Sequence, residues 1–255
     1  CSALVLFMTP GLAFFYGGLV RASSVVSMMM MSFGSLGLIG VLWIVYGYAI
    51  SFSSGTDAGF IGIESVFGVS PVKLFMNDAV AAAKSGNGFP LAFGGFQGTF
   101  AIITVALISG AIADRAKFGS WMVFAGLWAT LVYFPVASWV FNFTVVDGKV
   151  VSGGWLVHEI GLLDFAGGTV VEVASGASAL AVALVVGKRF GFTKGMHAPH
   201  NVPLVLIGAA ILLFGWFGFN AGSEAAADGI ASLAFVNTLA APVGAMLSWG
   251  LFEKI

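Results

Sequence analysis

The stretch from Ala22 to Thr56 reads ASSVVSMMMMSFGSLGLIGVLWIVYGYAISFSSGT and contains no charged residue. A helix needs about 20 apolar residues to cross a bilayer, so this stretch can hold one, near Val26 to Phe52. Working outward and cutting the sequence at its charges gives seven such runs. They are Cys1–Val20, the run near Val26–Phe52, the runs between Lys84 and Asp114 and between Lys117 and Asp147, about Asp164 to Val186, and the runs between Lys194 and Glu224 and between Asp228 and Glu253.

The composition of the 255 residues excludes a soluble globular protein. Hydrophobic residues make up 59% and charged residues only 8%, with a mean hydropathy of +1.04, whereas soluble domains carry about 25% charged residues. A net charge of -1 gives no basic face for nucleic acid. The single cysteine, Cys1, excludes an internal disulfide framework and a cysteine-based metal site. The runs are too long and uniform for a β-barrel, which predicts an all-α, polytopic integral membrane protein.

Lysines and arginines predict the orientation. Seven of the ten lie in connections after odd-numbered runs: Arg21, Arg115, Lys117, Lys188, Arg189, Lys194 and Lys254. Connections rich in these residues stay on the cytoplasmic side, so we expect a multi-pass protein of the cell membrane with its N-terminus outside. The sequence begins at Cys1 with no charged segment before an apolar run and stops directly after another, so we expect a chain trimmed at both ends.

Two glycine-bracketed aromatic clusters indicate internal symmetry. The first predicted span contains Gly11-Leu-Ala-Phe-Phe-Tyr-Gly-Gly18, and the sixth contains Gly215-Trp-Phe-Gly-Phe-Asn-Ala-Gly222. The two spans cross the membrane in opposite directions, as inverted repeats require. If the first five spans form one repeat, the last two begin a second.

Glu172 is the one ionisable residue well inside a predicted span. A charge at that depth costs roughly 2.5–3.5 kcal/mol by insertion scales, and acids within spans usually serve function. Glu172 can therefore be a cation or proton site in a pore, or a protonated acid bonded to a neighbouring helix. No Lys or Arg on another span is available to pair with it.

Asp164 and several aromatic residues complete the polar and aromatic candidates. Asp164 precedes Phe-Ala-Gly167-Gly168-Thr, so its carboxylate can cap the fifth span, and the double glycine can loosen the first turn beside an outer mouth. Phe96 and Phe100 lie four residues apart and therefore share one helix face. Trp216, Phe219 and Ser223, at positions i, i+3 and i+7, share a face of another helix. Such rings can form a cation-binding cage or simply fill packing gaps.

The remaining polar residues give little support to an enzyme. His197 and His200 form an H-x-x-H pair without an acid or thiol nearby, so no metal site and no cofactor are expected. His158 beside Glu159 is expected to be solvated. No phosphate loop and no nucleophile–base pair occurs within a span.

Taken together, five motifs resemble the ammonium transporter (Amt/Mep/Rh) family. They are Met8-Thr-Pro-Gly11 with the cluster to Gly18, Gly110-Ala-Ile-Ala-Asp114-Arg115, Asp164-Phe-Ala-Gly-Gly-Thr169, Pro199-His-Asn201 and Gly215 to Ser223. The resemblance covers residues 1–255 and implies a homotrimer of eleven-helix subunits built from two inverted five-helix repeats plus a last helix. This chain would supply helices 1 to 7 of the membrane domain.

The resemblance also implies a path for ammonium. Phe96, Ser223 and a residue on the fourth span would recruit NH4+ outside, with Asp164 in support, and Phe100 and Phe219 would close the pore, flanked by Gln97 and Trp216. Ammonium would then lose a proton, and NH3 and H+ would travel separately past two histidines. A PII-type cytoplasmic regulator is a possible partner, and methylammonium a possible substrate.

Two positions depart from the family pattern. The cage position on the fourth span is usually Trp, but the alignment places Phe141 there, with Trp139 two residues earlier. The first pore histidine would lie eight residues after Asp164, and that residue is Glu172. The partner histidine would lie beyond Ile255.

Three other functions compete with transport. A retinal-binding pump needs a lysine inside its last span, and this sequence has none there. An intramembrane hydrolase needs a second acid or a nucleophile–base pair. An ammonium sensor of the same fold stays open, because the residues that would distinguish it are not in this stretch.

Overall fold

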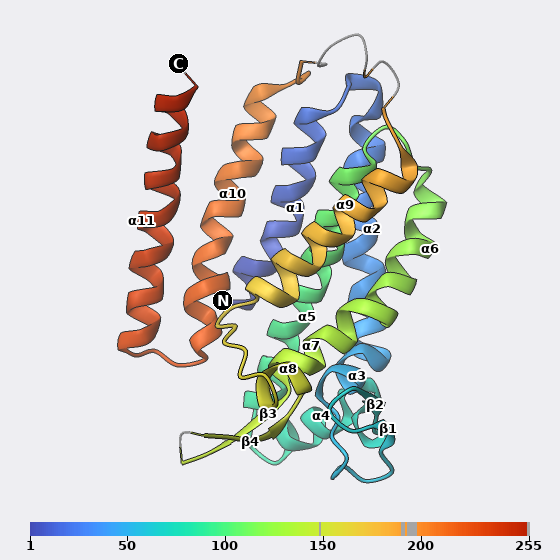
Figure 1. Cartoon of the computed structure of the whole chain (residues 1–255), viewed down its shortest axis with the longest axis vertical. Coiled ribbons are helices and arrows are strands. Elements are labelled where there is room, and N and C mark those ends of the chain that lie inside the picture. Colours follow the sequence, from blue (N-terminus) through green and yellow to red (C-terminus); the bar gives the residue numbers. More distant parts are fainter. Residues whose placement is uncertain (148, 190–191, 193–197, 254–255) are drawn as a thin grey trace.

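The computed structural model describes residues 1–147, 149–189, 192 and 198–253, and it is a bundle of long helices (Figure 1). Seven helical segments are long and apolar enough to cross a membrane, which confirms the seven predicted spans. They cover Ser2–Leu19, Ala22–Phe52, Phe89–Ile112, Phe118–Phe141, Gly168–Val186, Val202–Glu224 and Gly229–Phe252. The chain is therefore a multi-pass membrane protein.

Several spans are built from consecutive helical pieces rather than one uniform α-helix. A π-helix, whose turn holds one more residue than an α-helix, interrupts the second and fourth spans and opens the fifth. In order, the pieces are α1 Ser2–Leu19; η1 Ala22–Ser24, α2 Val25–Leu42, π-helix η2 Trp43–Gly47 and α3 Tyr48–Phe52; α5 Phe89–Ile108 and η4 Ser109–Ile112; α6 Phe118–Trp128, π-helix η5 Ala129–Tyr133 and α7 Phe134–Phe141; π-helix η6 Gly168–Val173 and α9 Ala174–Val186; α10 Val202–Asn220 and η8 Ala221–Glu224; and α11 Gly229–Phe252.

The longer connections fold at one end of the bundle (Figure 1). They contain two antiparallel hairpins, in which Ile61 pairs with Val69 and Phe143 with Gly153. The elements are β1 Ile61–Ile63, β2 Phe67–Val69, η3 Pro71–Met76, α4 Asn77–Lys84, β3 Phe143–Val146, β4 Lys149–Gly153 and α8 Trp155–His158. Hydrogen bonds join these connections to one another: the Trp155 amide donates to Ser65 O at 3.2 Å, and the Asn142 amide donates to Ser53 O at 2.8 Å.

Helices α1 and α10 lie side by side along their length (Figure 1). Glycines make this close approach possible: a Cβ on Gly208 would lie 2.3 Å from the Phe15 amide nitrogen, and one on Gly18 would lie 2.7 Å from Asn201 O. Small residues at helix crossings let backbones pack closely in lipid. Gly11 and Gly18 of the first cluster therefore lie against the sixth span and the residue before it, and Gly215 of the second cluster lies against Met8 and Leu4 of α1.

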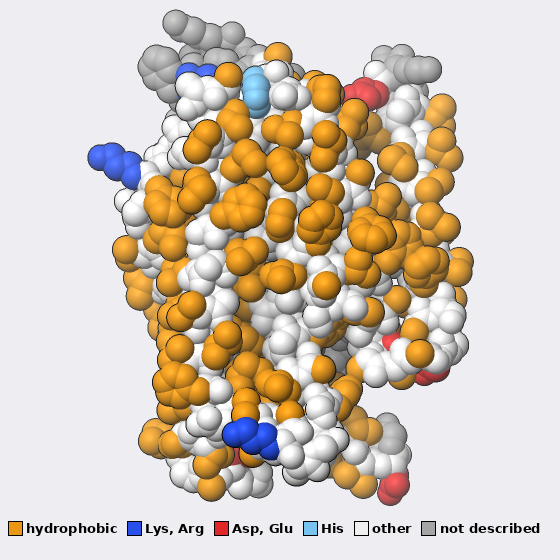
Figure 2. Space-filling model, turned by 180° about the vertical axis from the view of Figure 1, so that it is seen from behind, with side chains coloured by type: hydrophobic (Ala, Val, Ile, Leu, Met, Phe, Trp, Pro, Cys, Tyr) orange, Lys and Arg blue, Asp and Glu red, His pale blue; other side chains and the backbone are white. Residues whose placement is uncertain are grey.

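The core lies among α1, α2, α5 and the fourth span. Its largest fully buried side chains include Trp121, Tyr133, Phe100 and Phe134. In contrast, α11 buries only Thr238. Hydrophobic side chains cover the middle of the outer surface, and charged ones gather toward its two ends (Figure 2). This distribution is what a bilayer requires, because lipid solvates apolar side chains and headgroups solvate charged ones.

Candidate functional site

Four aromatic rings from α5 and α10 form a continuous stack, which we call the ring stack: Phe96, Phe100, Phe219 and Trp216. The ring centroids of Phe96 and Phe100 are 4.7 Å apart, those of Phe100 and Phe219 4.4 Å, and those of Phe219 and Trp216 5.2 Å. The structure thus brings together residues that the sequence placed on two separate helix faces. Such offset and tilted contacts are the preferred arrangements of aromatic rings.

The two central rings of the stack are almost completely buried. Phe100 is 1% exposed and Phe219 is 2% exposed. Each belongs to a regular helix, so the contact between the two rings does not depend on a loop. Gln97, the neighbour of Phe96 on α5, is also buried.

Asp164 lies just before the fifth span and holds its first turn. Its Oδ1 accepts the Gly167 amide at 2.7 Å, and its Oδ2 accepts the Thr169 amide at 2.7 Å and the Val170 amide at 3.3 Å. The predicted capping chemistry is therefore present, although Asp164 lies three residues before Gly167, the residue at the N-cap position. These bonds satisfy backbone donors that a helix start leaves free.

Gly167 joins this capped turn to the ring stack. Its φ of +134° is available to glycine but rarely to other residues. A Cβ at this position would lie 3.0 Å from Val171 Cγ2 and 3.5 Å from Phe219 Cζ. The Phe219 ring therefore packs against the turn that Asp164 holds, and the π-helix that follows matches the loosened first turn predicted from the double glycine.

Ser223 lies one helical turn beyond Phe219. Its hydroxyl donates to Phe219 O at 2.7 Å, which leaves the lone pairs of the oxygen as acceptors. Phe96 reaches the same region, since its Cζ lies 3.3 Å from the position of a Cβ on Gly222. An acceptor beside an aromatic ring is a chemically suitable environment for a small cation that carries only donors.

Phe141 and Trp139 end the fourth span in different surroundings. The Trp139 ring lies 5.6 Å from that of Trp155, and its indole N–H donates to Val66 O. Both residues are half-buried against the core, and Trp139 also contacts the connections. Within the part of the chain that the structure describes, Phe141 forms no ring pair with Phe96 or Phe219.

Glu172 lies in the π-helix η6 and is half-buried. Its Oε2 is inaccessible and has no hydrogen-bond partner among the described residues. Ser175 donates to the backbone carbonyl of Glu172 at 3.3 Å, not to its carboxylate. Among the described residues, Glu172 Oε2 therefore stays without a partner, and the role of Glu172 as a cation or proton site stays a prediction.

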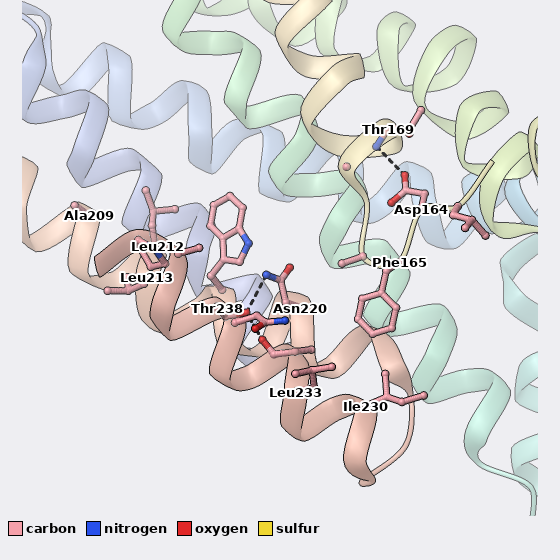
Figure 3. A pocket seen from close by; sticks show the side chains of 18 of the residues that line it. Asp164, Phe165, Thr169, Ala209, Leu212, Leu213, Asn220, Ile230, Leu233 and Thr238 are labelled. Atoms are coloured by element: carbon pink, nitrogen blue, oxygen red, sulfur yellow. Dashed lines mark hydrogen bonds between the residues drawn. The ribbon is translucent and has the colours of Figure 1, made fainter. Parts of the chain in front are cut away.

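A pocket of about 1010 Å³ opens between the start of the fifth span, α10 and α11 (Figure 3). Its walls are mainly apolar, and it holds two of the predicted site residues, Asp164 and Trp216. The Asn220 side-chain amide donates to Thr238 Oγ1 at 3.0 Å across one wall. The pocket therefore borders the ring stack through Trp216.

The sequence interpretation missed two buried hydroxyl groups in the third and fourth spans, those of Thr104 and Tyr133. Both residues are 0% exposed. The Thr104 hydroxyl donates to Phe100 O at 2.6 Å, whereas the Tyr133 hydroxyl has no partner among the described residues. Their residue types gave no signal, because Thr and Tyr are common in membrane helices.

A second polar cluster forms at the opposite ends of the spans. Asp114, whose side chain is 2% exposed, accepts a hydrogen bond from Arg189 and lies 3.7 Å from Arg21 Nε. Burial alone would raise the pKa of Asp114, but hydrogen bonds from Ser24 and Arg189 and the charges of both arginines hold it below its ordinary value. One carboxylate thus ties together the connections after the first, third and fifth spans.

The two described histidines have partners outside the ring stack. His200 Nδ1 is 2.9 Å from Val20 O, and His158 pairs with Glu159 in an exposed position. His197 lies outside the described residues. No cluster of metal-ligating side chains occurs in the described part of the chain.

The sequence is similar to known proteins over its whole length. A model described as the Ammonium Transporter Family matches residues 1–255. An ammonium transporter of Mycobacterium tuberculosis (strain ATCC 25618 / H37Rv) is 50% identical over 268 residues, covering 100% of this chain and 55% of the relative. Amt1, an ammonium transporter of Archaeoglobus fulgidus, is 45% identical over 246 residues, covering 95% of this chain and 56% of the relative. The chain thus spans little more than half the length of these relatives.

Solved structures share the fold. The crystal structure of Candida albicans Mep2 matches with a TM-score of 0.74 and 33% identity, covering 92% of this chain and 49% of that one. A structure described as a sensor Amt protein matches with a TM-score of 0.84 and 26% identity, covering 98% of this chain and 59% of that one.

Proposed function

The chain belongs to the ammonium transporter family, and from that premise we propose that the protein moves ammonium, as NH4+ or NH3, across the membrane. The observation that carries the proposal is the Phe100–Phe219 ring pair, with centroids 4.4 Å apart beside the turn that Asp164 holds. A buried aromatic barrier next to an anionic, hydrogen-bonded turn suits a cation that must be captured and then stripped of water.

The recruitment site consists of Phe96, Phe141 and Ser223, with Asp164 in support. Ammonium donates up to four hydrogen bonds and accepts none, so the Ser223 oxygen can accept one while ring faces attract the charge. Cation–π attraction is worth up to about 2 kcal/mol when the cation is desolvated. The Asp164 carboxylate adds a negative charge near the site without contacting the substrate.

The pore gate is the pair Phe100 and Phe219, flanked by Gln97 and Trp216. A bare cation does not pass such apolar rings cheaply, because it would lose its hydration without compensation. Release of a proton from NH4+ gives NH3, a small neutral molecule that crosses more easily. Glu172 lies beyond the gate as a carboxyl that can take up the proton or hold a passing cation.

The proposal extends to the surroundings of the protein. We place the N-terminus outside, in the plasma membrane of a cell that takes up nitrogen, and the assembly as a homotrimer in the lipid bilayer. A PII-type regulator would bind the cytoplasmic side, and methylammonium is a candidate second substrate. These assignments rest on family membership, the distribution of lysines and arginines, and the exposed apolar faces of α10 and α11.

The test is the ammonium-evoked current of the full-length protein, reconstituted in liposomes on a solid-supported membrane. We expect a saturating current with ammonium and none with sodium or potassium. A protein that binds ammonium but carries neither current nor NH3 flux would contradict transport and favour sensing, the alternative that the sensor Amt likeness keeps open.

A further inference from the structure

The indole of Trp43 lies directly against the backbone of α5. Its Nε1–H donates to Gly94 O at 2.9 Å, a buried hydrogen bond between the second and third spans. A Cβ on Gly98, one turn further along α5, would lie 2.7 Å from Trp43 Cδ1 and 2.8 Å from its Nε1. The indole therefore reaches α5 only because position 98 carries no side chain. Trp43 is also the first residue of the π-helix η2, a type of turn that is frequent at functional sites.

The two glycines and two rings of the ring stack lie on opposite sides of α5. Gly94 and Gly98 are four residues apart and share one face, and Phe96 and Phe100 share another. Two residues along an α-helix are separated by about 200° around its axis, so these faces point in nearly opposite directions. Trp43 thus supports α5 from the side opposite to the one on which Phe100 meets α10.

Aromatic rings hold the indole of Trp43 in place. Trp43 is 2% exposed, and its ring centroid lies 5.7 Å from that of Phe134. The rings of Phe52 and Tyr48 lie 6.2 and 6.3 Å away, and all three contacts are edge-to-face, an arrangement that aromatic rings prefer. Phe134 is the first residue of α7, the helix that ends at Phe141. The indole therefore contacts both spans that carry the phenyl rings assigned to the recruitment site.

An outer connection packs against the same face of α5. Phe75 and Met76 both have a φ of 56°, a conformation that residues other than glycine seldom adopt and that persists only where the surroundings enforce it. Met76 is buried, and its Cε lies 2.5 Å from the position of a Cβ on Gly94. The outer half of α5 is thus held by Trp43 and Met76 together.

We propose that Trp43 is a positioning residue that determines specificity. It fixes the place of α5 relative to the second span, and thereby the spacing between the rings of α5 and those of α10. The proposal rests on the proposed function, in which Phe96, Phe100 and Phe219 meet the substrate. Methylammonium is larger than ammonium by one methyl group, and a difference of one methylene in an apolar pocket is worth about 10–200-fold in selectivity. The spacing of the rings therefore sets how well the two cations are distinguished.

Two variants of the full-length protein should shift α5 in opposite directions. The readout is the methylammonium ratio, which is the maximal current divided by KM for methylammonium, relative to the same quantity for ammonium. Trp43→Phe removes the N–H and part of the ring, so α5 can relax toward the second span and away from α10. We expect the methylammonium ratio to rise by about threefold or more, a part of the selectivity that one methylene provides. The added Cβ of Gly98→Ala presses α5 away from Trp43 and toward α10, so the ratio should fall by a similar factor.

Trp121→Phe and Gly95→Ala are the matched controls. Trp121 is also buried, and its indole also donates to a backbone carbonyl of the second span, Met31 O at 3.0 Å. It joins α6 to α2, however, and neither helix carries an assigned site residue. Gly95 lies on α5 beside Phe96, but a Cβ there would meet no atom of the described residues within 4 Å. Both controls should keep the wild-type methylammonium ratio, and a rise in Trp121→Phe equal to that in Trp43→Phe would overturn the proposal.

Calorimetric binding gives a second ratio that needs no transport. The affinities of the detergent-solubilised protein for the two cations should show the same opposite shifts in Trp43→Phe and Gly98→Ala. A wild-type protein that binds but does not transport overturns transport alone, and the affinity ratio then tests Trp43. A wild-type protein that binds neither cation overturns the proposed function, and this proposal with it.

The remaining outcomes concern Trp43 alone. If the wild type transports ammonium and both folded variants keep its methylammonium ratio, or change it in the same direction, the role of Trp43 is overturned. Where Trp43→Phe does not fold, Gly98→Ala measured against Gly95→Ala decides, and an unchanged or raised ratio overturns the proposal. A ratio that rises in Trp43→Phe and falls in Gly98→Ala supports it, because a loss of stability would not move the two variants in opposite directions.

Discussion

The rings of Phe100 and Phe219 lie with their centroids 4.4 Å apart and their planes at 48°, although they belong to the third and sixth spans. Both are buried, and each is held on a regular helix. The contact between the two rings therefore depends on how α5 and α10 are placed relative to each other. Phe219 also contacts the Asp164-held turn through Gly167, so one ring connects three spans.

Phe219→Ala tests whether this pair is the gate. Removal of the ring eliminates its contacts with Phe100 and Trp216, so we expect ammonium-evoked current per folded protein to fall at least tenfold, the effect of about 1.4 kcal/mol at the barrier. Phe217→Ala is the matched control on the same helix, because the Phe217 ring instead pairs with Phe235 of α11 at 4.6 Å. Equal currents in the two variants would mean that Phe219 is ordinary packing.

Gly208→Ala tests the close approach of α1 and α10. A Cβ there would lie 2.3 Å from the Phe15 amide nitrogen and 2.6 Å from Gly11 O, both backbone atoms that cannot move alone. Overpacking of this kind costs about 1–3 kcal/mol, so we expect a lower thermal unfolding midpoint in detergent. Gly244→Ala on α11 meets nothing within 4 Å and should be neutral or slightly stabilising. A Gly208→Ala variant as stable as the wild type would contradict the packing argument.

The sequence predicted the spans well because each is bounded by charges that cannot enter the bilayer. Arg21 and Asp114, for example, lie directly beyond helical segments ending at Leu19 and Ile112. Helical spacing also predicted that Phe96 and Phe100 share a face. What spacing cannot provide is which faces meet, so the contact between Phe100 and Phe219 required the structure.

Two other features were beyond prediction for physical reasons. A turn of a π-helix holds more residues than a turn of an α-helix, so each residue rotates by a smaller angle about the helix axis. The sequences of these segments look like those of other apolar helices. The burial of the Tyr133 side chain could therefore not be predicted from helical spacing. The Asp114 cluster draws charges from three connections that are distant in sequence. Arg21 and Arg189 predict the orientation, but their pairing with Asp114 depends on how the helices pack.

Asp114→Asn tests the cluster that joins the three connections. Asn tolerates the φ of +61° at this position but removes the negative charge. We therefore expect the free energy of unfolding at pH 7 to fall by about 1–3 kcal/mol. This is less than for a fully buried ion pair, because Arg21 and Arg189 stay partly exposed. The measurement is thermal unfolding. Glu159→Gln, in an exposed pair, should change stability little.

The same variant carries a pH prediction. The folded pKa of Asp114 lies below its ordinary value, so its stabilisation is complete above the unfolded value of about 3.9 and is lost as pH falls through the lower folded value. The difference between wild type and Asp114→Asn should therefore shrink only below about pH 4. A difference that already vanishes at pH 6 would contradict the assigned ionisation.

Cys1 tests both the orientation and the position of the recruitment site. It is the single cysteine of the 255 residues, it is exposed, and its Sγ lies 2.9 Å from the position of a Cβ on Gly222, beside Ser223. A membrane-impermeant cationic thiol reagent added outside should therefore label Cys1 and reduce the ammonium current several-fold. The Cys1→Ser variant should be insensitive to the reagent. Labelling only from the inside would contradict the proposed orientation.

Glu172→His tests the charge at the pore site. A carboxyl group is either negative or neutral, whereas an imidazole is neutral or positive, with an ordinary pKa of about 6.5. As external pH falls below that value, the imidazole of the variant gains a positive charge that repels an incoming cation, while the carboxyl group of Glu172 only becomes neutral. We expect the ammonium current of Glu172→His to fall more steeply on acidification than that of the wild type. Superimposable current–pH curves would show that residue 172 does not face the path of the cation or the proton.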